Sequence, residues 1–174
     1  MKFEVECDLE EFKRYYKSLE HLHDYFKTLG LADVKFEELG VVEEEIIKRD
    51  PSHLIVWREK DEIIGDAIWH ETSTDEHRIG DPRDKEDKVI LRRLLGGKKD
   101  NIIELHEVWL KEEHRGKGYG KKFFEFFEEF IRKKGYDSIV YYTDHPAAIA
   151  ICRKRGYKEG FLEKERWHVF CLSL

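Results

Sequence analysis

Residues 114–121 read His-Arg-Gly-Lys-Gly-Tyr-Gly-Lys, and this glycine run separates two segments of different periodicity. The segment before it, 102–110, is mainly apolar like a buried strand, whereas apolar residues recur at helical spacing over 122–134. A chain with this order must fold so that a strand leads through a tight turn into a helix. Because a helix start leaves backbone N–H groups without intrahelical acceptors and carries partial positive charge, the run predicts a phosphate site.

The glycines of the run suit this role, because glycine adopts positive φ and lets the backbone approach an anion closely. Three cations lie among them, so the complete set is Gly116, Gly118 and Gly120 with Arg115, Lys117 and Lys121. Glycine spacing alone equally suits a plain turn. The two common nucleotide loops fit poorly, since no Gly-Lys-Ser/Thr follows four variable residues and no ribose-binding acid stands at the required spacing.

Around this run the chain resembles the GNAT superfamily, the acyl-CoA-dependent N-acetyltransferases. The central motif of that family is Arg or Gln, two residues, Gly, one residue, and Gly or Ala, which Arg115, Gly118 and Gly120 match. Apolar residues stand where the family's fourth strand has them, at Leu105, Val108 and Leu110.

A second signature of the family also has a counterpart downstream. In the family it runs Asn-Pro-Ala-Ala, then Tyr, then Gly-Phe; here 145–148 read His-Pro-Ala-Ala, Cys152 takes the tyrosine position and 156–157 read Gly-Tyr. With two motifs at matching separation, the resemblance extends over about residues 52–174.

The resemblance implies an α/β (α+β) fold, in which helices flank a mixed, mostly antiparallel sheet with splayed fourth and fifth strands. In the family the pantetheine arm of acetyl-CoA pairs with the backbone of the fourth strand, here Val108, Trp109 and Leu110. No metal is expected. The other expected cofactor contacts are Arg115, Gly116, Lys117, Gly118, Tyr119, Gly120, Lys121, His145 and Ala148. His145, which replaces the family's Asn, can instead contact the acceptor or cap the following helix.

Acetyl transfer requires a neutral amine and therefore a proton acceptor. Counting back from Arg115 without gaps, Glu104 stands where histone acetyltransferases of this superfamily carry a catalytic glutamate, and it is the first candidate. His106 follows two residues later on the same strand face, and an imidazole's ordinary pKa of about 6.5 suits proton acceptance. Glu107 faces the opposite way unless a bulge intervenes. Each of these residues can equally be a charged residue near a strand end.

The departing thiolate requires a proton, and here the chain departs from its family. Cys152 replaces the tyrosine that usually lies near the cofactor's sulfur. A thiol with an ordinary pKa near 8.5 is mostly protonated at neutral pH but is a weak donor. Tyr142, Tyr141 or Tyr157 can act in its place, or water or the ammonium product supplies the proton. Cys152 also suits a small position in the core.

The remaining periodicity predicts the other elements. Helices are predicted over 9–29, 36–49 and 147–155, and strands over 53–58, 63–70, 139–143 and 167–172. The least regular part, 71–101, predicts a long charged insertion between the third and fourth strands with one short helix over 85–95. The whole of 1–174 is expected to form a single N-acetyltransferase domain.

Composition limits the class of protein. Hydrophobic and charged residues each make up 40% of the 174 residues, which is too apolar for a disordered chain and too charged for a membrane span. The lack of a signal-peptide pattern or a long apolar stretch predicts a cytoplasmic location. Three widely spaced cysteines, Cys7, Cys152 and Cys171, predict free thiols. The chain has no Gln, one Asn and many Glu, Lys and Arg, which is typical of proteins from very hot habitats.

Two other classes of function compete with an enzyme. A sensor or assembly module would bind acetyl-CoA without turnover; a sealed acceptor channel favours it, whereas an open channel lined by acids and aromatic residues favours the enzyme. A nucleic-acid module would depend on basic clusters at 133–134 and 153–155, and the net charge of −6 opposes it.

The acceptor is expected to be a primary amine on a polyamine-like molecule, an amino acid or antibiotic, or a protein. Members of this family often form homodimers.

Overall fold

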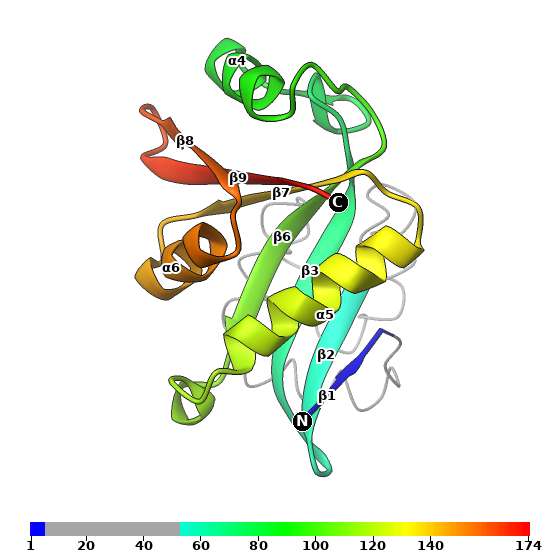
Figure 1. Cartoon of the computed structure of the whole chain (residues 1–174), viewed down its shortest axis with the longest axis vertical. Helices are drawn as coiled ribbons and strands as arrows, with labels where there is room; N and C mark the ends of the chain where they lie inside the picture. Colours follow the sequence, from blue (N-terminus) through cyan, green and yellow to red (C-terminus); the bar gives the residue numbers. More distant parts are fainter. Residues whose placement is uncertain (6–52) are drawn as a thin grey trace, which may run out of the picture.

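The computed structural model describes residues 1–5 and 53–174 (Figure 1). Seven strands form one sheet in the order β1-β2-β3-β6-β7-β9-β8, and β6 and β7 are its parallel pair. The strands are β1 Lys2–Glu4, β2 His53–Glu59, β3 Glu62–Thr72, β6 Ile102–Leu110, β7 Ser138–Thr143, β8 Lys158–Leu162 and β9 Trp167–Ser173. This mixed, mostly antiparallel sheet with flanking helices confirms the fold class expected from the sequence.

Helices α5 (Tyr119–Lys133) and α6 (Pro146–Lys154) cover one face of the sheet, and α5 runs across the strands in Figure 1. The buried stripe of α5 is phenylalanine-rich, and Phe123, Phe124 and Phe127 are at most 1% exposed. Alternate strand residues such as Leu105 pack against this stripe. The core on this face therefore depends on the amphipathic pattern of α5.

Helix α4 (Lys85–Leu94) covers the opposite face near β8. Asp84 caps its start by accepting a hydrogen bond from the backbone N–H of Asp87 at 3.0 Å. The helix approaches β8 closely at Gly160, where a Cβ would come within 2.7 Å of the Cγ2 of Ile90. The lack of a Cβ at Gly160 therefore lets α4 pack closely against β8, and this contact holds the insertion against the sheet.

Most predicted elements are present, with a few differences. Helix α5 begins at Tyr119 rather than at 122, and four short strands were not predicted: β1, β4 (Glu76–Arg78), β5 (Asp81–Pro82) and β8. The first three are too short to show an alternating pattern, and Gly160 interrupts the pattern of β8. The helices predicted over 9–29 and 36–49, and Cys7, lie outside the described residues. Within 1–5 and 53–174, no helix has the length and apolar character needed to cross a membrane.

Candidate active site

A bulge in β6 brings three polar side chains to one cavity. The pairing of β6 with β3 shifts by one residue between Leu105 and Glu107, so β6 has one residue more than β3 there, His106. The extra residue changes the alternation of side chains, and Glu104, His106 and Glu107 all line the same cavity. In a regular strand Glu107 would face away from Glu104 and His106. Because of the bulge it faces the same cavity instead.

Beyond this bulge β6 and β7 diverge. Their parallel pairing extends over Ile102–Leu105 and Ser138–Tyr141. β6 then continues along β3, whereas β7 continues along β9, and the two ribbons separate in Figure 1. This divergence is the expected splay of the fourth and fifth strands of the sheet. The strand residues predicted to bind the cofactor through their backbone lie on the diverging part of β6: Val108, Trp109 and Leu110.

The glycine run forms the turn between β6 and α5. Gly116 and Gly118 have φ of 74° and 81°, and Gly118 is the N-cap of α5. A Cβ at either position would have no atom within 4 Å, so the positive φ is what favours glycine there. Gly120 differs from the expectation, since it lies in the first turn of α5 without a positive φ. Its Cβ would come within 3.1 Å of the Cδ1 of Ile151, so its small size allows α5 and α6 to approach.

Two side chains of the run bind neighbouring strands. Arg115 donates from Nε to the backbone oxygen of Leu110 at 2.9 Å, which holds the turn against the end of β6. Tyr119 donates its hydroxyl to the carboxylate of Glu59 on β2, and this hydrogen bond raises the pKa of the tyrosine. These contacts hold the start of α5 beside the ends of β2 and β6.

The other predicted cofactor residues lie at two helix starts. Lys117 and Lys121 are exposed near the first turn of α5, whose backbone N–H groups also face outward from the helix end. His145 is the exposed N-cap of α6; its side chain makes no capping hydrogen bond, and its backbone N–H donates to the Oγ1 of Thr143 at 3.1 Å. Ala148 is partly buried against the core. The side chain of His145 therefore does not cap α6.

A cavity of about 300 Å³ lies on the α4 side of the sheet. It is lined from the insertion, β6, β7 and the β8–β9 hairpin by His77, Asp84, Asp87, Glu104, His106, Glu107, Tyr142, Leu162, Glu165 and Trp167. Acids and aromatic residues dominate this lining, and the volume is in the range of small-ligand sites. Of the two arrangements that the sequence left open, this one favours an enzyme over a sensor.

Arg83 lies at the centre of a polar network beside the cavity, and its side chain is fully buried. Its guanidinium donates to the Oδ2 of Asp87 at 2.9 Å, and to the hydroxyls of Tyr142 and Thr72, both at 2.6 Å. Its Nε donates to the backbone oxygen of Ser73 at 2.8 Å. Tyr142 in turn donates to the Oδ1 of Asp87 at 2.7 Å. This arginine thus connects α4 with β3 and β7.

Glu104 is buried among basic groups. Its Oε2 lies 3.5 Å from the Nε2 of His70 and 3.7 Å from the Nη2 of Arg83. Burial alone raises the pKa of this carboxyl, but the contact with His77, at 3.6 Å, and the neighbouring positive charges outweigh burial and lower the pKa to about 2. Glu104 is therefore ionised at neutral pH and is a weak proton acceptor.

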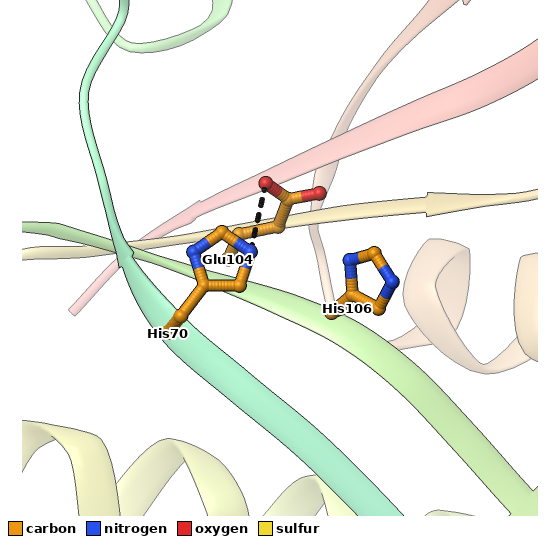
Figure 2. Close-up of side chains that lie close together, drawn as sticks. All are labelled: His70, Glu104 and His106. Atoms are coloured by element: carbon orange, nitrogen blue, oxygen red, sulfur yellow. Dashed lines mark ion pairs between the residues drawn. The ribbon is translucent and has the colours of Figure 1, made fainter. Parts of the chain in front are cut away.

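His70 lies on β3 opposite Glu104, and Figure 2 shows both side chains with that of His106. The Nδ1 of His70 lies 2.8 Å from the backbone oxygen of Glu71 and can donate to it, which leaves Nε2 as an acceptor in the neutral ring. Among the described residues, neither this Nε2 nor the Oε2 of Glu104 has a hydrogen-bond partner. The two atoms lie 3.5 Å apart, and they form an ion pair when the imidazole is protonated.

The same three side chains raise the question of a metal. Each of His70, Glu104 and His106 offers one ligand atom, and these atoms lie within 4.8 Å of one another (Figure 2). Two histidines and a carboxylate are a known zinc-binding set. However, the guanidinium of Arg83 lies 3.7 Å from the same carboxylate oxygen. Because that fixed positive charge repels a second cation, the cluster is a poor metal site.

Of the candidate acids, Cys152 is fully buried in the core under α5. Burial raises the pKa of this thiol to about 12, so it holds its proton tightly. Tyr141 and Tyr157 also lie in the core, whereas Tyr142 lines the cavity with its hydroxyl engaged by Arg83. The structure thus leaves none of the four with a free donor at the cavity. Their roles stay predictions.

Several residues of the site were missed in the sequence: His70, His77, Arg83, Asp84, Asp87, Glu165 and Trp167. The sequence offered only a weak indication of these residues. Arg83 and Asp87, for example, have the i,i+4 spacing of an ordinary exposed helical ion pair. The pair is buried only because α4 packs against the sheet.

Comparison with known proteins agrees with this geometry. The model of a protein family described as the acetyltransferase (GNAT) family matches residues 16–157. No curated protein sequence matches the chain significantly.

Solved structures share the fold at low sequence identity. A spermidine N-acetyltransferase from Vibrio cholerae, in complex with CoA and spermine, is 13% identical with a TM-score of 0.66, over 99% of this chain and 94% of that one. A ribosomal-protein-alanine N-acetyltransferase from Brucella melitensis is 15% identical with a TM-score of 0.55, over 100% and 99%. An acetyltransferase from Bacillus subtilis, in complex with CoA, is 18% identical with a TM-score of 0.51, over 76% and 82%.

Proposed function

The chain belongs to the acetyltransferase (GNAT) family, and from this premise we propose that it moves the acetyl group of acetyl-CoA to a primary amine by direct attack in a ternary complex. The observation that carries the proposal is the cavity on the bulged part of β6, where β6 begins to diverge from β7. In this family the thioester arm lies along that strand. An amine in the cavity would therefore lie beside the arm.

The chain offers features that fit the cofactor. The turn at Gly116 and Gly118 is open and leads into the start of a 15-residue helix, where N–H groups and partial positive charge suit a pyrophosphate. Lys117 and Lys121 add exposed positive charge beside it. Acetyl-CoA, when bound, supplies the activated acetyl group. The exposed imidazole of His145 at the start of α6 is a further contact that this proposal includes.

The amine must lose a proton before it attacks, and we assign this proton to His106. His106 lines the cavity at the bulge and is partly exposed. Glu104, the first candidate from the sequence, is buried and its pKa of about 2 makes it a poor acceptor. Its charge instead stabilises a protonated imidazole nearby. Glu104 is thus a positioning and electrostatic residue in this proposal.

The CoA thiolate must gain a proton once the C–S bond breaks and the amide C–N bond has formed. Cys152 is buried with a raised pKa, and the hydroxyl of Tyr142 is engaged by Arg83 and Asp87. The proposal therefore assigns this proton to water or to the ammonium product. No protein acid is required.

The experiment that tests the function combines two measurements on one sample. Acetyl-CoA is titrated by calorimetry, and a mixed panel of amines is then analysed by mass spectrometry for acetylated products. Binding together with a product is the expected result. Binding without a product from any amine or protein would support the non-catalytic acetyl-CoA sensor or assembly module. An absence of binding would overturn both readings.

A matched pair of variants locates the cofactor. Lys117→Gln with Lys121→Gln removes two charges beside the start of α5, and we expect acetyl-CoA affinity to fall up to roughly 30-fold, at up to about 1 kcal/mol per exposed charge. Lys133→Gln removes an equally exposed charge at the far end of the same helix and should leave affinity unchanged. Equal effects of both changes would mean that the helix start is not the phosphate site.

Further properties expected from the sequence belong to the same proposal: a cytoplasmic location, a source in a hot habitat, one domain over 1–174, possible homodimers, and no membrane or nucleic-acid partner.

A further inference from the structure

The cavity carries a strong excess of negative charge. Five of its ten described lining residues are acidic, and none of the ten is lysine or arginine: the acids are Asp84, Asp87, Glu104, Glu107 and Glu165. Carboxylates gathered in one hollow repel one another unless a cation joins them. This lining is therefore suited to a positively charged ligand.

A positive charge that partly compensates these acids lies beside the inner, buried end of the cavity. Arg83 is buried, contacts Asp87 at 2.9 Å and lies 3.7 Å from Glu104. One guanidinium beside two carboxylates reduces the net charge of this end from −2 to −1. A reacting amine near His106 can therefore lose its proton here more easily than it could beside uncompensated carboxylates.

The uncompensated negative charge lies at the outer, exposed end of the cavity. Asp84, at the start of α4, and Glu165, between β8 and β9, are exposed residues of the lining. Among the described residues Lys164 forms an ion pair with Asp84, and this contact is weak because its Nζ is 4.0 Å away and its side chain is 73% exposed. An ammonium group at this end keeps its proton and is attracted by both acids.

An aromatic side chain lies at the same end. Trp167, the first residue of β9, lines the cavity and is 42% exposed. An exposed indole beside carboxylates suits a cation on an aliphatic chain, since the ring attracts the ammonium and covers the methylenes.

We infer that the acceptor is a small linear polyamine, whose terminal amine reacts at His106 while a second ammonium group lies between Asp84, Glu165 and Trp167. This inference rests on the proposed acetyl transfer. An amino-acid acceptor fits poorly, because its carboxylate would meet acidic residues with no lysine or arginine in the described lining.

The test compares a polyamine with a monoamine and with a peptide amine. With acetyl-CoA held saturating, initial rates are measured for spermidine, for n-butylamine and for a lysine-containing peptide. We expect kcat/KM for spermidine to exceed that for butylamine by about 100-fold, since two acids and an indole each add on the order of 1 kcal/mol. The preference should shrink as salt screens the exposed acids.

Variants then locate the second ammonium. Asp84→Asn and Glu165→Gln should each lower the spermidine-to-butylamine ratio about fivefold, mainly through KM for spermidine. Asparagine keeps the cap of α4, so the fold is retained. Glu163→Gln is the matched control, because Glu163 is an exposed acid of the same turn that does not line the cavity. It should leave both rates unchanged.

Failure of the inference and failure of the function give different results. Equal rates with spermidine and butylamine, acetylation of the peptide alone, or ratios unaffected by both variants would overturn the polyamine inference while acetyl transfer stands. Acetylation of no amine at all would overturn the proposed function.

Discussion

His106 and Glu104 stand two residues apart on β6 but have different surroundings. Glu104 is 6% exposed and is surrounded by basic groups, whereas His106 is partly exposed at the bulge. Burial and charge thus keep Glu104 ionised, whereas the position of His106 lets it contact a ligand in the cavity. The residue types alone do not reveal this difference, because it depends on the surroundings of each side chain.

The first prediction concerns the pH dependence of the rate. In the wild type, kcat/KM should fall on the acid side as the base becomes protonated. His106→Asn should lower the rate by roughly 100-fold or more and remove that limb, whereas Glu104→Gln should lower the rate and keep the limb. Both variants should bind acetyl-CoA with nearly the wild-type affinity. An unchanged profile in His106→Asn would exclude it as the base.

The second prediction concerns acid stability. Because the pKa of Glu104 in the folded protein is about 2, below its ordinary value of 4.5, its contribution to stability is complete above about pH 4.5 and is lost as the pH falls toward 2. The difference in unfolding free energy between wild type and Glu104→Gln should therefore shrink on acidification. Denaturant unfolding of both proteins at pH 3 and pH 6 measures it. A difference that is constant with pH would contradict the lowered pKa.

The third prediction separates packing from chemistry at Cys152. The side chain is fully buried, so Cys152→Ala should cost about 1 kcal/mol of unfolding free energy while turnover stays at the wild-type level. Cys152→Ser should cost more, because a buried hydroxyl needs a hydrogen-bond partner. Unfolding curves and initial rates on the same preparations measure the two effects. Loss of turnover in a folded Cys152→Ala protein would restore the thiol as the acid.

At the scale of elements, the turn between β6 and α5 shows that similar residues in one motif have different physical roles. Gly118 ends the turn with φ of 81°, whereas Gly120 lies inside the helix and faces Ile151. Glycine is therefore needed at Gly118 for its left-handed backbone and at Gly120 for its small size, which lets α5 contact α6.

The fourth prediction compares these two glycines. Gly118→Ala should cost about 1 to 2 kcal/mol through the left-handed backbone alone, and should weaken acetyl-CoA binding if the turn shifts. Gly120→Ala should cost less, since its methyl group meets only the flexible tip of Ile151 at 3.1 Å. Denaturant unfolding and acetyl-CoA titration of both variants measure the effects. A larger loss of stability at Gly120 would mean that α5 and α6 cannot separate.

At the scale of the whole molecule, the insertion of 71–101 is part of the site. Arg83 connects it to the sheet through contacts with Thr72, Asp87 and Tyr142. The cavity exists because α4 is held over the sheet by this buried network and by the close contact at Gly160.

The fifth prediction tests that connection. Arg83→Met should cost about 3 to 5 kcal/mol of unfolding free energy, because it leaves two buried carboxylates without compensation. Arg92→Met is the control: its ion pair with Asp75 is about half exposed, at 53% and 47%, and should contribute less than about 1 kcal/mol. Guanidinium unfolding of both proteins measures the difference. Similar costs would show that the network does not hold the insertion.

The sequence by itself determined the glycine turn and, among the described residues, the helices and the longer strands, because these depend on local periodicity and backbone preference. The helix over 85–95 and the strands over 53–58 and 139–143 correspond closely to α4, β2 and β7. The family resemblance was carried by the same local motifs. Glu104 and His106 were identified as candidates because they lie a fixed number of residues before the turn.

Only the tertiary structure decided how these side chains are used. The bulge at His106, which turns Glu107 toward the cavity, depends on the register with β3 and leaves no mark in local sequence. The low pKa of Glu104 depends on Arg83 and His77, which are brought from the insertion by packing. Burial and electrostatics are sums over residues distant in the chain, so they are settled only when the sheet and α4 have assembled.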